Sequence, residues 1–328
     1  MKAKIGWTTN RLHSFAGITI SLVALFCIPL LGSSYYDFLF SLALIYSMWA
    51  LGYNFLLGYT GLLSFGHGAF FGLGAYTVAI LVTKFSFKPF LPVIGIAVLA
   101  TAFLGAVIGY LCVRYTEVYF ALLTLAFSMF FYALVFKLYY WTGGSDGIGI
   151  RPPDLFGLRF SAIEYPAHYY YITLAFFLIS VYIGWRIVNS PFGKALQAIR
   201  DNPLKAEAIG IPVRRYKWYA FIISTAYSGL AGALYAPLFG HVVPDLFHFL
   251  FAGEVLFATL LGGYTIFLGP IVGGIVFTVA KRYITAVTIY WPLVLGALLV
   301  AVTLFFPQGI VGTTYSLLRR KIGIKGGE

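Results

Sequence analysis

The chain has few charged residues: Asp, Glu, Lys and Arg together make up 10% of its 328 positions. Soluble domains carry about 25%. Hydrophobic residues reach 61%, and together these values exclude an ordinary soluble fold. The composition therefore indicates an integral membrane protein.

Acidic residues are fewer than basic ones: the chain has 10 Asp and Glu against 22 Lys and Arg, and a formal net charge of +12. The basic residues are scattered over loops and tails. Loops rich in Lys and Arg stay in the cytoplasm, and such residues also meet anionic lipid headgroups. We therefore expect membrane lipids as partners and no nucleic acid. Most of the acids lie in loops, so the chain also lacks a buried series of carboxylates for a proton relay.

Several kinds of reactive site are missing as well. Cys27 and Cys112 both lie in apolar runs, which argues against a disulfide framework. No Gly-x-x-x-x-Gly-Lys-[Ser/Thr] loop is present, so the chain is predicted to hold no ATP and no cofactor of its own. One set of possible metal ligands has i, i+4, i+7 spacing: His241, Asp245 and His248. Pro244 argues against a regular helix through them, and we predict no metal site.

Long apolar runs recur along the chain. A membrane-crossing helix needs about 20 apolar residues, and eight runs approach that length: residues 15–31, 36–57, 62–83, 90–113, 118–138, 169–188, 218–239 and 286–306. The stretch 250–282 is too long for one crossing and too short for two comfortable ones, and Gly262-Gly263 and Gly269-Pro270 interrupt it. We interpret it as a re-entrant pair or as two short spans.

These runs predict an all-α, polytopic membrane protein with about eight to ten transmembrane segments and glycine-broken or re-entrant helices in each half. Residues 1–328 are expected to form a single transmembrane domain. The amino end, the segment 189–217 and the carboxyl tail are basic, so all three are predicted to face the cytoplasm. Six apolar runs lie between the amino end and the segment 189–217, and an even number of crossings is required if both face the cytoplasm. A break within the run 62–83 would change the number of crossings.

The segment 189–217 is predicted to form two short amphipathic helices on the cytoplasmic side. Ser190 is a good N-cap and Pro191 suits the first helical position. Asn202-Pro203 restarts the pattern, and Gly210 ends it. The apolar face of the first helix is formed by Phe192, Leu196 and Ile199. Such a pair either docks a partner or lies on the lipid headgroups.

The stretch 54–76 is rich in glycine, so helices can approach closely there and the backbone can open to line a cavity. Polar groups at membrane depth are uncommon and often functional. The candidate substrate pathway is Asn54, Tyr59, Gly61, Ser64, Gly66, His67 and Glu254. The alternative for His67 is tight packing against a neighbouring carbonyl. Glu254 either faces the cavity, where it would meet a substrate ammonium, or lies at the outer interface beside Asp245 and His248.

A loop at 139–167 is predicted on the outer side. It contains the turn Thr-Gly-Gly-Ser-Asp-Gly at 142–147, whose glycines permit positive φ and whose Asp suits a turn. A tight turn needs no partner, so a purely local role stays open.

Several of these strings occur in the same order in one protein family. The strings are Ser-Pro-Phe-Gly-Lys-Ala-Leu at 190, the glycine-rich stretch 54–76, the turn 142–147, Leu-Gly-Gly at 261, Leu-Gly-Pro at 268 and Phe-Pro-Gln-Gly at 306. They resemble the LivM-type permeases (the LivH/LivM permease family) of branched-chain amino-acid ABC importers. The resemblance extends over nearly the whole chain.

The resemblance implies roles and partners. It implies two ATP-binding-cassette ATPase subunits, which bind the ATP, a second homologous permease, and a periplasmic or lipid-anchored substrate-binding protein. The implied ATPase-coupling residues are Phe192, Gly193, Ala195, Ile199, Arg200, Glu207, Ala208 and Gly210. The implied docking site for the binding protein is Thr142, Gly143, Gly144, Ser145, Asp146 and Gly147. The implied location is the bacterial or archaeal cytoplasmic membrane.

The predicted function is thus that of a permease subunit, without enzymatic activity of its own, that moves branched-chain amino acids. Two alternatives within transport stay open: an importer of urea or short amides, and a passive channel for a small neutral solute. An integral membrane enzyme is disfavoured because the sequence contains no evident nucleophile–base cluster.

Overall fold

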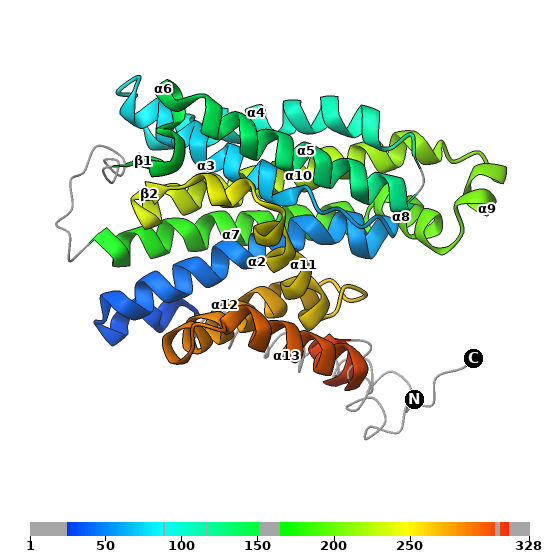
Figure 1. Cartoon of the computed structure of the whole chain (residues 1–328). Coiled ribbons are helices and arrows are strands. Elements are labelled where there is room, and N and C mark those ends of the chain that lie inside the picture. The colour runs from blue at the N-terminus through cyan, green and yellow to red at the C-terminus, as the bar shows by residue number, and fades with distance from the viewer. Residues whose placement is uncertain (1–24, 88, 116, 151–164, 306–308, 315–328) are drawn as a thin grey trace.

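The computed structural model describes all residues except 1–24, 88, 116, 151–164, 306–308 and 315–328. The described part is a bundle of helices (Figure 1). Its α-helices are α2 (Ser34–Thr60), α3 (His67–Thr83), α4 (Phe90–Cys112), α5 (Glu117–Lys137), α6 (Tyr139–Thr142), α7 (Tyr165–Asn189), α8 (Pro191–Asp201), α9 (Pro203–Ala208), α10 (Val213–Phe239), α11 (Phe249–Gly262), α12 (Gly269–Val287) and α13 (Trp291–Phe305). The 3-10 turns are η1 (Ile28–Leu31), η2 (Gly144–Asp146) and η3 (Pro244–Phe247).

The predicted all-α, polytopic membrane fold is confirmed. Six described helices are long and apolar enough to cross a membrane: α2, α4, α5, α7, α10 and α12. Three described helices, α3, α11 and α13, are apolar but shorter. The predicted first run, 15–31, lies largely outside the described residues, so the total of eight to ten segments stays a prediction.

Helices α2 and α10 form the centre of the bundle. In their most apolar stretches, 89% and 67% of the residues are buried, against 28–33% for the other four long helices. The two central helices pack on each other, and α3 packs on α10. The outer helices expose large apolar side chains, such as Leu99 and Phe103 of α4, as expected for a surface that faces lipid.

Glycines allow α3 and α10 to approach closely. A Cβ atom at Gly74 would overlap the backbone of Gly229, and one at Gly232 would overlap the carbonyl group of Phe71. Small residues at helix crossings are typical of membrane bundles, where close backbone packing supplies much of the attraction. The glycine-rich stretch predicted from the sequence therefore serves helix packing at these positions.

The bundle has two distinct ends. At one end, the strands β1 (Ile148–Gly149) and β2 (His241–Val242) pair antiparallel, with Ile148 opposite Val242. At the other end lie α8 and α9 (Figure 1). Helix α7 and helix α10, of 25 and 27 residues, connect the two ends. At about 1.5 Å per residue each is long enough to cross a membrane core.

The run 62–83 and the stretch 250–282 are not continuous helices. The run 62–83 is helical only from His67, and the residues before it are extended or turned. The run 250–282 forms two helices, α11 and α12, which meet in a turn around Gly263. The break within 62–83 is the one that the sequence left open, and its residues include the candidate pathway residues Ser64 and Gly66.

Candidate functional site

The first break follows α2. Helix α2 ends at Thr60, and Gly61 takes the left-handed conformation (φ 74°) that closes the helix. The amide of Leu62 donates to the carbonyl of Leu56 at 3.1 Å, which satisfies one of the last carbonyls of α2. Helix α3 then starts at His67, so residues 61–66 form the first break.

A buried polar network fills the first break. The His67 ring lies 2.9 Å (Nδ1) from the Ser64 hydroxyl and 2.7 Å (Nε2) from the Ser224 hydroxyl of α10. The Tyr53 hydroxyl donates to the Ser64 carbonyl at 2.9 Å. Ser64, His67 and Ser224 are fully buried. The network satisfies His67 through two hydroxyl groups, so it ties the break to α10 and favours a packing role in this conformation.

The other candidate pathway residues in this half of the chain are also buried or closely packed. Gly66 packs against Thr124 of α5, and a Cβ there would overlap that backbone. Tyr59 is buried. Asn54 is fully buried, and neither polar atom of its amide has a hydrogen-bond partner among the residues that the structure describes. A buried polar group without a partner costs about 1–3 kcal/mol and calls for an explanation.

The second break follows α10 and comprises residues 240–248. Gly240 closes α10 with φ 66°, and β2 and η3 follow. The ring of His248 then caps α11 by accepting from the amide of Leu250 at 3.3 Å. The Ser128 hydroxyl of α5 donates to the Phe247 carbonyl at 2.6 Å and fixes η3 against α5. Each half of the chain thus has a 27-residue helix, a break and a shorter helix.

The two breaks meet inside the bundle. Gly68, in the first turn of α3, lies against the carbonyl of Leu246 in η3 and against Ala252 in α11. Helix α2 runs toward α8, whereas α10 runs away from it, so the two halves run in opposite directions. Discontinuous helices related by such an inversion are a feature of many transporters, which bind their substrates where the breaks meet.

A buried ion pair lies behind the second break. The Lys281 ammonium of α12 lies 2.5 Å from Glu254 Oε1, and the Tyr46 hydroxyl of α2 donates to Oε2 at 2.7 Å. The side chains of Glu254 and Lys281 are 10% and 26% exposed. Glu254 therefore neither meets the outer surface nor offers a free carboxylate, since both of its oxygens already have partners.

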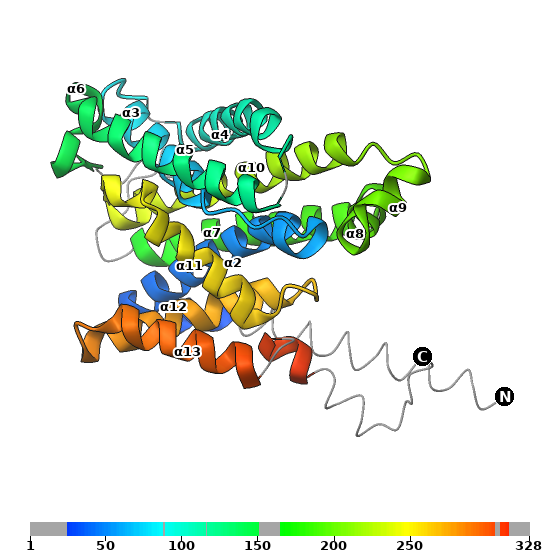
Figure 2. The same cartoon turned by 45° about the vertical axis from the view of Figure 1, so that its right-hand side comes forward.

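Glu254 nevertheless lines a cavity of about 620 Å³ together with Asp245 and His248. The cavity lies between η3, α11 and α13, and Tyr132 of α5 and Phe65 of the first break also line it. Figures 1 and 2 both show α11 between α5 and α13. Glu254 thus lies in a cavity wall together with Asp245 and His248, and whether it meets a substrate ammonium stays a prediction.

The segment 189–217 forms the two short helices that the sequence predicted. The Ser190 hydroxyl accepts from the amide of Gly193 at 3.3 Å and caps α8, and Asn202 caps α9 in the same way through Lys205. Gly210 has φ 88° and ends the segment. The local residues therefore account for both helix starts and for the final turn.

The predicted coupling residues divide into two groups. Gly193 and Ile199 are buried against the bundle, and Phe192, Ala195 and Arg200 are partly buried. Glu207, Ala208 and Gly210 are exposed, next to two exposed apolar side chains, Leu204 and Ile209. Helix α8 thus packs against the bundle, whereas most residues of α9 and of the turn after it are exposed.

Arg200 points inward, toward the end of α2. Its guanidinium donates to the carbonyl of Gly58 at 2.8 Å and also pairs with Asp201 at 3.0 Å. Gly58 in turn lies against the carbonyl of Tyr264, in the turn between α11 and α12. One side chain of α8 therefore contacts the end of the helix that precedes the first break.

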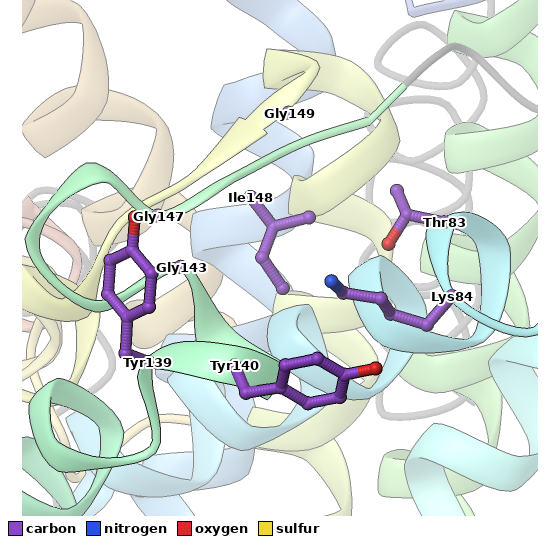
Figure 3. A pocket seen from close by; sticks show the side chains of 8 residues that line it. All are labelled: Thr83, Lys84, Tyr139, Tyr140, Gly143, Gly147, Ile148 and Gly149. Carbon is purple, nitrogen blue, oxygen red and sulfur yellow. The ribbon is translucent and has the colours of Figure 1, made fainter.

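The turn 142–147 lies at the β1–β2 end. Gly143, Gly144 and Gly147 have positive φ, and the Thr142 hydroxyl donates to the Val135 carbonyl at 2.6 Å. A cavity of about 450 Å³ lies beside the turn, lined by Lys84 and Tyr140 among others. Figure 3 shows the Lys84 side chain reaching toward Ile148 above Tyr140, and its amine lies 5.3 Å from that ring.

Residues 151–164 of the predicted outer loop lie outside the described residues, as do both ends of the chain. His248 acts as a helix cap, and Pro244 begins η3 rather than continuing a helix. Within the described ranges no group of three His, Cys, Asp or Glu side chains is placed to hold a metal ion.

Sequence reasoning missed three participants: Lys281, Ser224 and the inward contact of Arg200. The basic pair Lys281-Arg282 at the end of the apolar stretch 250–282 was a signal for Lys281, because charges at membrane depth are usually paired. Ser224 carried no such signal, since hydroxyl residues are common in apolar helices. The direction of the Arg200 side chain depends on how α8 packs against α2, and the spacing of residues in the sequence does not predict it.

Comparisons with known proteins agree on one family. Residues 35–303 match the family described as branched-chain amino acid transport system / permease component. The LivM permease of Escherichia coli K12 is 32% identical over 311 residues, which cover 88% of this chain and 72% of that protein. LivM of Salmonella typhimurium is 31% identical with the same coverage, and LivH of E. coli K12 is 25% identical over 81% of this chain and 91% of its own length. No solved structure matches the chain.

Proposed function

The chain belongs to the family of permease components of branched-chain amino acid transport systems, and from this premise we propose a specific role for it. It is the transmembrane permease subunit of an ATP-binding-cassette importer that moves branched-chain amino acids across a bacterial or archaeal cytoplasmic membrane. Separate ATPase subunits bind and hydrolyse the ATP, because the chain has no phosphate-binding loop.

The observation that carries this proposal is the outward face of α9. Leu204 and Ile209 are 79% and 76% exposed, beside exposed Glu207 and Gly210. The buried side chains Leu196 and Ile199 of α8 pack this segment against the bundle. A passive channel has no need for an exposed, partly apolar surface on such a segment.

The proposed mechanism is alternating access. Two ATPase subunits close on ATP and push on α8 and α9, and Arg200 transmits the displacement to the end of α2. The bundle then reopens on the other side around the two breaks. The amide of Asn54, which has no hydrogen-bond partner among the described residues, fits such a cycle, because a second conformation that pairs it would recover about 1–3 kcal/mol.

The proposed partners follow from the same reading. A second homologous permease completes the pathway, as the relatives of two kinds, LivM and LivH, suggest. A periplasmic or lipid-anchored substrate-binding protein docks at the turn 142–147, at the β1–β2 end. Helices α8 and α9 lie at the opposite end of the bundle, where ATPases would bind (Figure 1).

The test is uptake of labelled leucine into vesicles that contain this chain, a second permease, the ATPases and the binding protein. Uptake should require ATP and should be lost in Glu207→Lys and in Gly210→Pro, whose φ is incompatible with 88°. Gly210→Asn is the matched control, because Asn tolerates the left-handed region. Uptake that does not require ATP and is unchanged in both variants would instead support a passive channel. Transport of urea but not of leucine would support an importer of urea or short amides.

A further inference from the structure

The cavity at the second break combines an apolar wall with two carboxylates, those of Asp245 and Glu254. Its volume of about 620 Å³ lies within the range of about 300–1,000 Å³ that is usual for small-molecule sites. Phe65, Leu256, Phe257 and Leu295 contribute apolar surface to the wall. This lining suits an aliphatic group and offers little to urea, which has no apolar part.

Asp245 is the carboxylate of this wall that remains accessible. It is exposed, and among the described residues its side chain accepts one long hydrogen bond, of 3.5 Å, from the Tyr132 hydroxyl to Oδ1. A bond of that length is weak and leaves capacity for a stronger donor. An ammonium group entering the cavity would form the charge-assisted hydrogen bond that Tyr132 does not supply.

The cation Lys281 does not line the cavity, but it contacts two residues that do. Its ammonium pairs with Glu254 and lies 5.1 Å from the centre of the Trp291 ring, and both Glu254 and Trp291 line the cavity. The ammonium group has three donors, and Glu254 Oε1 uses one of them. His248, which also lines the wall, is engaged in capping α11.

We propose that this cavity, between η3, α11 and α13, binds a zwitterionic aliphatic amino acid during translocation. Asp245 receives the ammonium group, and the apolar wall takes the side chain. The inference rests on the proposed transport function and deepens it, because it places the substrate at the second break and assigns Asp245, rather than Glu254, to the ammonium group.

The first test uses variants in the reconstituted importer. Asp245→Asn keeps the size of the side chain and removes its charge, so leucine uptake at low substrate should fall about 10- to 100-fold, the range for loss of a charge-assisted hydrogen bond. Asp245→Glu should retain most of the uptake. Excess 4-methylpentanoate, which is leucine without its ammonium group, should not compete in the wild type.

The second test reads occupancy directly and does not depend on uptake. Leu250 is 68% exposed and lines the cavity, so a Leu250→Cys variant in a Cys27→Ser background is labelled with a maleimide in the assembled importer, because Cys27 is itself exposed. Excess leucine should slow this labelling several-fold, and 4-methylpentanoate should not. The protection should disappear when Asp245→Asn is added.

The outcomes separate the inference from the proposed function. ATP-driven leucine uptake by the wild type, combined with unchanged uptake in Asp245→Asn or with labelling that ignores leucine, would overturn this inference alone. Absence of ATP-driven leucine uptake in the wild type would overturn the proposed function itself.

Discussion

The two breaks differ in how they satisfy their polar groups. At the first break, His67 is enclosed between the hydroxyl groups of Ser64 and Ser224 and is fully buried. At the second break, Glu254 and Lys281 neutralise each other beside a cavity that still presents Asp245. The first break is thus packed against α10 through buried hydrogen bonds, whereas the second borders a cavity of about 620 Å³.

The ion pair at the second break gives the largest expected effect. Lys281→Met leaves the buried carboxylate of Glu254 without its partner and should destabilise the protein by about 3 kcal/mol, at the low end for a broken buried pair because Lys281 is partly exposed. The double variant Glu254→Gln/Lys281→Met should recover at least half of this loss. Thermal unfolding in detergent measures both, and equal losses in the two variants would contradict the pairing.

The helix crossing behind the first break should be the next most sensitive. Gly232→Ala places a methyl group on the carbonyl of Phe71 and should cost about 1–3 kcal/mol. Gly95→Ala is the control, because the space around Gly95 is open and alanine favours a helix by about 1 kcal/mol. Equal melting temperatures for the two variants would show that α3 and α10 are not in close contact.

The hydroxyl network of the first break can be tested by deletion. Ser224→Ala removes the partner of His67 Nε2 and should destabilise the protein by about 1–2 kcal/mol, because the ring atom is left buried without a hydrogen bond. Thr285→Ala, at an exposed hydroxyl that bonds its own helix, should change stability far less. Combining Ser224→Ala with His67→Phe should give less than the sum of the single effects.

The smallest effect on stability is expected at Arg200. Arg200→Gln removes the bond to the Gly58 carbonyl, and because the side chain is about a third exposed the loss should be about 1 kcal/mol or less. The coupling should suffer more, with several-fold fewer leucine molecules transported per ATP hydrolysed. Asp201→Asn removes the exposed partner of Arg200 and serves as the control. If Arg200→Gln transports as many leucine molecules per ATP hydrolysed as the wild type, Arg200 does not transmit the ATP-driven displacement.

Much of the architecture could be predicted because it depends on local chemistry. The long apolar runs predicted the helices, and Ser190, Asn202 and Gly210 predicted the limits of α8 and α9 through caps that need only neighbouring residues. Glycine clusters predicted that helices would break or approach closely, although spacing did not decide between these two outcomes at residues 61–66.

The site was less predictable because its contacts join distant segments. Glu254 is 27 residues from Lys281 and 208 from Tyr46, so its partners depend on how α2, α11 and α12 pack. The same holds for His67 and Ser224, which are 157 residues apart. The roles of the coupling and docking residues depend on other proteins and stay predictions.

The account depends most directly on the two ends of the bundle lying on opposite sides of the membrane. In a Cys27→Ser background, single cysteines are placed at Leu204 of α9 and at Ser145 of the turn 142–147, and each is treated with a membrane-impermeant thiol reagent from one side at a time. The account predicts that position 204 is labelled only from the cytoplasmic side and position 145 only from the outside. Labelling of both positions from the same side would contradict the proposed coupling of α8 and α9 to cytoplasmic ATPases, with the binding protein docked at the opposite end.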